Sequence, residues 1–164
     1  MAQALAVAAL FATIFCLSIS PSLAHNSDTF SVEGKVYCDT CQVMFETKIS
    51  EPIAGATVRL ECRKRFGGGL TFSVEGVTDK NGNYSLHVEG DHEEEICTLL
   101  PIKSSRPDCN EQMANYGKIV VSLTSNSGVS SNVRYANPLG FTIKEALPDC
   151  VKVLTDMGFF PSHD

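Results

Sequence analysis

The fold of this chain is decided by the stretch Glu33-Gly34-Lys35-Val36-Tyr37-Cys38-Asp39-Thr40-Cys41. Side chains that suit a protein interior alternate along it with polar ones, which is the period of a β-strand with one buried face. The residues expected on the inner face are Val32, Gly34, Val36 and Cys38. The stretch ends in two cysteines three positions apart. We therefore expect further strands to stack on this one and other cysteines to pair back to it.

Residues 1–24 are predicted to form a secretory signal peptide. An uncharged apolar run extends from Ala4 to about Ser20, and small residues occupy the third and the first position before a cleavage after Ala24. A membrane anchor is the alternative, but the run is short for a span of ~20 residues and contains hydroxyl side chains. Because no second apolar run occurs, the sequence predicts a soluble protein of the extracellular space, with no membrane span in the mature chain.

Residues 25–164 are expected to form one domain. The net charge is −6 and no stripe of Lys and Arg occurs, so nucleic acid is not an expected partner. One of the seven cysteines lies in the signal peptide, and an even number in a secreted chain implies three disulfides. Spacing alone does not choose among the possible pairings. The six cysteines are Cys38, Cys41, Cys62, Cys97, Cys109 and Cys150.

Alternation continues along the chain and predicts about seven short strands separated by turns. The strongest turn is 78–83, where Asp79 is expected to cap the turn and Asn81-Gly82 to supply left-handed backbone positions. Leu70 is placed on the inner face of its strand, and Pro101 is expected to end another. The expected strands are 30–38, 56–63, 70–77, 83–89, 96–100, 117–124 and 139–143.

Residues 148–157 instead have helical spacing, with Gly158 as a C-terminal cap. The residues expected on the inner side of this helix are Val151, Leu154 and Met157. A single short helix needs fastening, so we expect Cys150 to be joined to the end of a core strand. The sequence thus predicts an all-β fold: a single antiparallel β-barrel or sandwich of about seven strands with one short C-terminal helix and three disulfides.

The opening stretch closely resembles the signature of the pollen allergen Ole e I-like family, with Gln42 where that signature has Arg. Further matching segments span the mature chain: Gly55–Val58 with Cys62, Thr78–Tyr84, Ala136–Phe141 and Cys150–Leu154. The resemblance implies a secreted plant protein, often of pollen, with an antiparallel β-barrel or sandwich fold and no established enzymatic activity. It also implies the disulfides Cys38–Cys109, Cys41–Cys150 and Cys62–Cys97.

Cys38-Asp39-Thr40-Cys41 also has the spacing of a redox motif or of half a zinc site. The motif follows a strand, whereas a reactive thiolate is favoured at a helix N-terminus, and four other cysteines can act as partners. We therefore expect structural disulfides, and no metal or cofactor. The four histidines, His25, His87, His92 and His163, are not spaced as metal ligands or as part of a catalytic triad.

Asn83-Tyr84-Ser85 is an acceptor sequence for N-linked glycosylation, and Asn83 is expected on an outward face beside a turn. The basic tip Arg63-Lys64-Arg65 next to Phe66 offers a possible contact for an acidic polysaccharide. The acidic run 91–95 lacks the alternating ligands of a calcium loop and is expected to be solvated.

These observations favour a secreted, non-enzymatic pollen protein that binds a cell-wall polysaccharide or a receptor ectodomain, with suggested roles in pollen hydration, germination or tube growth and potential as an allergen. One alternative is an enzyme or enzyme inhibitor that uses loops 64–69, 91–95 and 125–131. Another is a carbohydrate-binding module, although the chain has no Trp for stacking on sugars. Its stacking residues would have to be Tyr37, Tyr116 and Tyr135.

Overall fold

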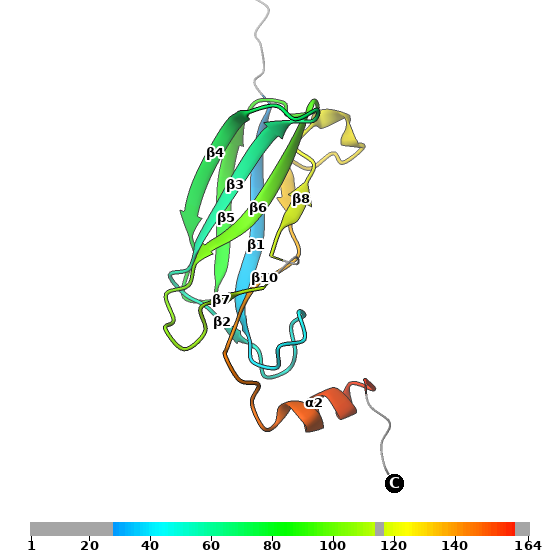
Figure 1. The fold of residues 1–164 in the computed structure, drawn as a ribbon. Helices are drawn as coiled ribbons and strands as arrows, with labels where there is room; N and C mark the ends of the chain where they lie inside the picture. Colours follow the sequence, from blue (N-terminus) through cyan, green and yellow to red (C-terminus); the bar gives the residue numbers. More distant parts are fainter. Residues whose placement is uncertain (1–27, 114–116, 160–164) are drawn as a thin grey trace, which may run out of the picture.

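The computed structural model describes residues 28–113 and 117–159. The expected signal peptide lies outside these residues. Within them no helix is long and apolar enough to cross a bilayer. Two β-sheets pack face to face, and a short helix lies beyond one end of them (Figure 1). The strands are β1 Thr29–Asp39, β2 Glu51–Pro52, β3 Thr57–Lys64, β4 Leu70–Val77, β5 Asn83–Glu89, β6 Glu95–Lys103, β7 Glu111–Gln112, β8 Ile119–Val121, β9 Val133–Tyr135 and β10 Leu139–Thr142, and the helices are η2 Ser125–Ser127 and α2 Cys150–Asp156.

Strand β1 is the centre of one sheet. Its first part pairs with β5 and β9, and its second part pairs with β2 and β10. The other sheet has the order β4-β3-β6-β8 and is antiparallel. The prediction of a mostly β fold with one C-terminal helix is confirmed. A purely antiparallel arrangement is wrong, because β9 and β10 both run parallel to β1.

The core lies between the two sheets and contains most of the side chains that alternation placed there. From the opening stretch, Val36 and Cys38 are fully buried. Tyr37 was expected to face outward but is also buried, because its ring packs over Gly140 of the neighbouring strand β10. The other large, fully buried side chains are Phe30, Val32, Ile53, Val58, Leu60, Leu86, Val88, Leu99, Leu123, Leu139 and Phe141.

Three local expectations are wrong. Leu70 is half exposed, because it is the first residue of β4 at the tip of the hairpin. Val151 and Met157 are both exposed, since α2 buries only Cys150 and Leu154. Strand β6 continues through Pro101 to Lys103, and the register with β3 shifts next to this proline. On the side away from β3, β6 pairs with β8 only at Cys97–Leu99. Pro101 therefore has no β8 residue opposite it that would need its missing N–H group.

The turn between β4 and β5 has the predicted cap. The Asp79 carboxylate accepts hydrogen bonds from the N–H groups of Asn81 (2.8 Å) and Asn83 (2.9 Å). Of the pair Asn81-Gly82, only Gly82 has a positive φ, at 80°. A Cβ atom at Gly82 would lie 2.6 Å from the Val36 carbonyl oxygen, so glycine also permits the close approach of this turn to β1.

Candidate functional site

The two cysteines of the opening stretch have different partners. Cys38 is bonded to Cys109, in the loop before β7, and Cys41 to Cys150, at the start of α2. The third disulfide joins Cys62 and Cys97, which face each other on β3 and β6. These are the pairs that the family resemblance implies. Because both sulfurs of Cys38-Asp39-Thr40-Cys41 are bonded, neither is a free thiol that could act as a nucleophile or a zinc ligand.

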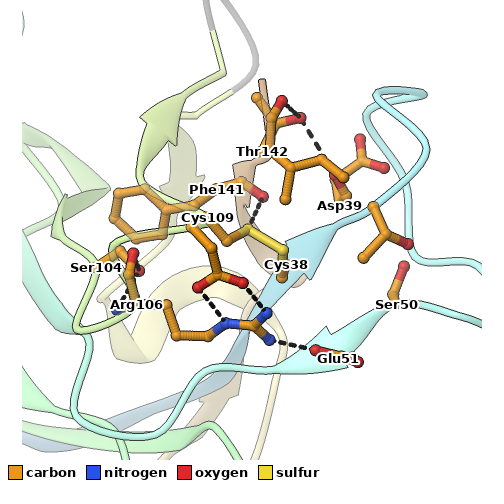
Figure 2. Close-up of a disulfide and its surroundings, with 12 residues drawn as sticks. Cys38, Asp39, Ser50, Glu51, Ser104, Arg106, Cys109, Phe141 and Thr142 are labelled. Atoms are coloured by element: carbon orange, nitrogen blue, oxygen red, sulfur yellow. Dashed lines mark hydrogen bonds and ion pairs between the residues drawn. A yellow bond between two sulfur atoms is a disulfide. The ribbon is translucent and has the colours of Figure 1, made fainter. Parts of the chain in front are cut away.

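The residues between these two cysteines organise the loop that follows. Asp39 is fully buried, and its carboxylate accepts the N–H groups of Cys41 (3.1 Å) and Met44 (2.7 Å). The Thr40 hydroxyl donates to the Ile49 carbonyl at 3.0 Å. Figure 2 shows the Thr142 hydroxyl donating to the Asp39 carbonyl next to the Cys38–Cys109 disulfide. The motif therefore has a structural role: it fixes the end of β1 and the loop after it.

Arg106 links the loop that carries Cys109 to β2. Its guanidinium donates to the side chains of Asp108 and Glu51 (Figure 2). These hydrogen bonds, the one to Asp108 foremost, raise the pKa of Arg106, and the bond from Arg106 lowers the pKa of Asp108. Both acids are largely exposed, so the contact positions the loop without contributing much stability.

Three loops meet at the opposite end of the molecule from α2, at the top of Figure 1: residues 64–69, 91–95 and 124–131. We call this region the three-loop end. The Arg65 guanidinium donates to the Glu93 carbonyl at 2.8 Å. The Asn126 side chain donates to the Glu93 carboxylate at 2.7 Å, and the Thr124 hydroxyl to the Asp91 carboxylate at 3.0 Å. Loops that the sequence only marked as candidates are thus joined into one surface.

The three-loop end has more acidic than basic side chains. Its cations are Lys64 and Arg65, and neighbouring Arg63 is paired with Glu61 at 3.0 Å. Partial burial opposes ionisation of Asp91, but hydrogen bonds from Glu93, Thr124 and Ser125 outweigh it and lower its pKa. The carboxylates of the surface are Asp91, Glu93, Glu94 and Glu95. The predicted basic tip is therefore not an isolated cationic patch.

Two open hollows adjoin the three-loop end. One of about 330 Å³ is lined mainly by Lys64, Arg65, Phe66 and Glu94. A smaller one of about 140 Å³ lies between Arg65, Val120 and Thr124. The Phe66 side chain is 99% exposed beside the larger hollow. Phe66 is the most exposed large apolar side chain among the described residues, which makes it the leading candidate contact residue of this surface.

His92 lies just below this surface. Its ring is mostly buried, with Nδ1 2.6 Å from the Glu95 carboxylate and the ring centre 5.3 Å from that of Phe72. Ligand atoms of His92, Glu95, Cys62 and Cys97 lie within 4.8 Å of one another. The two sulfurs form a disulfide, which leaves two ligands where a zinc site needs three or four.

The other candidate residues lie elsewhere. His87 is exposed on the outer face of β5, as expected, and Asn83 is exposed at the first position of that strand. Of the tyrosines proposed to stack on sugars, Tyr37 is buried and Tyr135 is 80% exposed on β9. His25, Tyr116 and His163 lie outside the described residues. Of the two candidate stacking residues that the structure describes, only Tyr135 is therefore available to a sugar.

Comparison with known proteins decides the family. A profile described as "Pollen protein Ole e 1 like" matches residues 28–158. The chain belongs to this family. It is 46% identical to anther-specific protein LAT52 of Solanum lycopersicum over 158 residues, which covers 96% of this chain and 98% of that protein. It is 47% identical to Olee1-like protein of Betula pendula over 153 residues, with 92% of each chain covered.

One solved structure and a further sequence relative agree with this family assignment. The crystal structure of the major plantain pollen allergen Pla l 1 superposes with a TM-score of 0.66 and 37% sequence identity, covering 74% of this chain and 99% of that one. Pollen allergen Che a 1 of Chenopodium album is 44% identical over 163 residues, with 98% and 97% of the two chains covered. The family of this chain therefore comprises pollen-specific proteins and pollen allergens.

Proposed function

We propose that this chain is secreted, acts without catalysis, and binds a protein partner on the surface of pollen or of the tissue that pollen meets, through the three-loop end. Residues 1–24 supply the expected signal for secretion. The pollen and anther relatives support the tissue. A contribution to pollen hydration, germination or tube growth is the corresponding physiological role.

The single observation that carries the proposal is the exposed ring of Phe66. Covering a phenylalanine side chain with a partner is worth about 1.5–3 kcal/mol, and aromatic residues are frequent centres of binding energy at protein interfaces. Phe66 is followed by Gly67, Gly68 and Gly69, so its loop can adjust to a partner. We therefore place Phe66 in an apolar pocket of the partner.

The charges around Phe66 indicate which charge the partner's surface should carry. Two cations and four carboxylates give the three-loop end a negative balance, which favours a basic surface on the partner. The same balance disfavours an acidic wall polysaccharide. A receptor ectodomain with an apolar pocket rimmed by Lys and Arg fits this description. Catalysis by these loops is disfavoured because Asp91, Glu93 and Arg65 are each engaged in hydrogen bonds that tie one loop to another.

The test is the binding of labelled, folded protein to the surface of living pollen tubes and stigma cells. We expect saturable binding that is lost when the cells are treated with protease and kept when they are treated with pectin or glucan hydrolases. Phe66→Ala should weaken the binding about tenfold or more. Tyr135→Ala, which removes an exposed ring on β9 outside the three-loop end, is the control and should bind like the unmodified protein.

Three outcomes would overturn the proposal. Binding that survives protease but is lost after polysaccharide hydrolysis would identify a wall polysaccharide as the partner. Equal binding by Phe66→Ala and the unmodified protein would remove the three-loop end from the interface. Turnover of pectin, glucan or peptide substrates that is abolished by a point substitution would replace binding with catalysis.

A further inference from the structure

We propose that Asn83 carries an N-linked glycan whose first sugar lies in a hollow on the outer face of β1 and β5, at the end of the molecule remote from the three-loop end. This inference rests on the proposed secretion, because the modification takes place in the secretory pathway. Asn83-Tyr84-Ser85 is the acceptor sequence.

The position of Asn83 in β5 directs its side chain to solvent. Exposed and buried residues alternate along this strand without interruption, beginning with an exposed Asn83 and a buried Tyr84. The backbone is held in place, since the N–H of Asn83 donates to the Asp79 carboxylate at 2.9 Å.

A hollow of about 430 Å³ adjoins Asn83. Its walls combine polar groups with one apolar surface, as a sugar requires. The carboxylates of Glu33 and Asp79 and the hydroxyl of Ser85 can accept or donate hydrogen bonds. The side chain of Val77, which is 63% exposed, offers an apolar contact for the methyl of an N-acetyl group. Covering Val77, at the end of β4 in the other sheet, would remove an exposed apolar side chain from solvent.

The attachment precedes folding of this part of the chain. In the transfer, Nδ2 of Asn83 forms a bond to C1 of the first sugar of a lipid-linked oligosaccharide diphosphate. The bond from C1 to the phosphate oxygen breaks, the lipid diphosphate leaves, and the amide nitrogen loses one proton. In the folded protein Ser85 is paired with Glu33 in the ladder, and its hydroxyl lies 2.9 Å from that of Ser31. The acceptor sequence is therefore open to the transferase only before β5 pairs with β1.

The glycan at this position leaves the proposed binding surface free. Asn83 begins β5 and Glu89 ends it, next to the three-loop end. A strand of this length spans about 20 Å, at ~3.3 Å per residue. The sugar therefore shields the outer face of β1 and β5 near the turn 78–83, while Phe66 stays accessible.

The test uses the full chain expressed in plant secretory cells, with Ser85→Ala to destroy the acceptor sequence and Ser85→Thr to preserve it. We expect the unmodified sequence and Ser85→Thr to carry a sugar mass that a peptide N-glycosidase removes with conversion of Asn83 to Asp, and Ser85→Ala to carry none. Amide hydrogen exchange at residues 77–79 should be slower in the glycosylated protein than in Ser85→Ala, which lacks the sugar but keeps Asn83.

Each contrary result has its own meaning. Secreted, disulfide-bonded protein with the unmodified mass at Asn83 would overturn the glycan and leave the proposed function standing. Equal hydrogen exchange at residues 77–79 with and without the sugar would overturn its placement in the hollow. A chain retained in the cell with residues 1–24 uncut would overturn the proposed secretion, and this inference with it.

Discussion

Tyr84 lies across Gly34 of the neighbouring strand, so closely that its ring and hydroxyl occupy the space that a Cβ atom at Gly34 would need. The two residues are direct partners in the β1–β5 ladder. The glycine of the opening stretch is thus required by packing and not by an unusual φ angle. Its absent side chain is the reason why the buried Tyr84 ring fits against β1.

Replacing Gly34 by alanine should destabilise the protein, because neither backbone strand can move away without breaking the ladder. The expected loss is about 1–3 kcal/mol, the usual range for forcing a methyl group into a packed core. Denaturant unfolding measures it. Gly69→Ala is the matched control, since nothing lies within 4 Å of a Cβ atom at that position. Equal midpoints for the two variants would show that Tyr84 does not occupy this space.

The protein should lose stability between pH 10 and pH 12. Burial raises the pKa of Tyr84 to about 12, and burial together with the charges of Asp39 and Glu46 raises the pKa of Tyr37 to about 12 as well. A phenol with a raised pKa favours the folded state while it is neutral. This stabilisation is therefore complete below pH 10, the pKa of a tyrosine in the unfolded chain. It is lost as the pH rises through the higher pKa of the folded state.

Each tyrosine contributes on the order of 2–3 kcal/mol to this loss. Tyrosinate absorbance followed alongside unfolding measures the effect, and the two signals should rise together. Tyr84→Phe should reduce the alkaline loss. At neutral pH this variant should be at least as stable as the original, because the Tyr84 hydroxyl is buried without a hydrogen-bond partner among the described residues. Tyr84 ionising near pH 10 in the folded protein would contradict this account.

Arg134 should hold the loop before β9 in place. Its guanidinium lies 4.8 Å from the centre of the Phe30 ring and donates to the carbonyls of Ser122 (3.1 Å) and Thr124 (3.0 Å). Lysine keeps the charge but not the planar set of donors, so Arg134→Lys should destabilise the protein by about 2 kcal/mol. It should also speed proteolysis within residues 125–131.

Arg63→Lys is the control for this prediction. Arg63 is half exposed and pairs with Glu61 on the surface, so its substitution should change stability by less than about 1 kcal/mol. If the two lysine variants unfold at the same denaturant concentration and are cleaved at the same rate, the bonds of Arg134 do not fix the loop.

Alternation in the sequence was sufficient to predict β4 and β5, whose bounds match, and β3 within one residue at each end. These are hairpin strands with one buried face, where the period of the side chains and the turn residues point to the same structure. The parallel pairing of β9 and β10 with β1 could not be predicted, because local pattern carries no information on strand direction. Pro101 was misleading because its effect depends on whether a neighbouring strand needs its N–H.

The site was predictable only in part. The three loops could be named from their composition. Their meeting depends on contacts such as the hydrogen bond from Arg65 to the backbone carbonyl of Glu93, and every residue type has such a carbonyl, so the sequence does not mark it. Arg134 was missed because arginine is usually exposed and nothing in its sequence neighbourhood marks it as buried. The disulfide pairs came from the family resemblance, since cysteine spacing leaves the pairing open.

The central claim is that the paired cysteines of the opening stretch are structural and join β1 to two different parts of the chain. Peptide mapping of the secreted protein under non-reducing conditions tests it most directly, with cleavage before Asp39 to separate Cys38 from Cys41 and after Lys48 to separate Cys41 from Cys62. We predict three cross-linked products, joining Cys38 to Cys109, Cys41 to Cys150 and Cys62 to Cys97. Free thiols at Cys38 and Cys41, or a bond between these two residues, would contradict it.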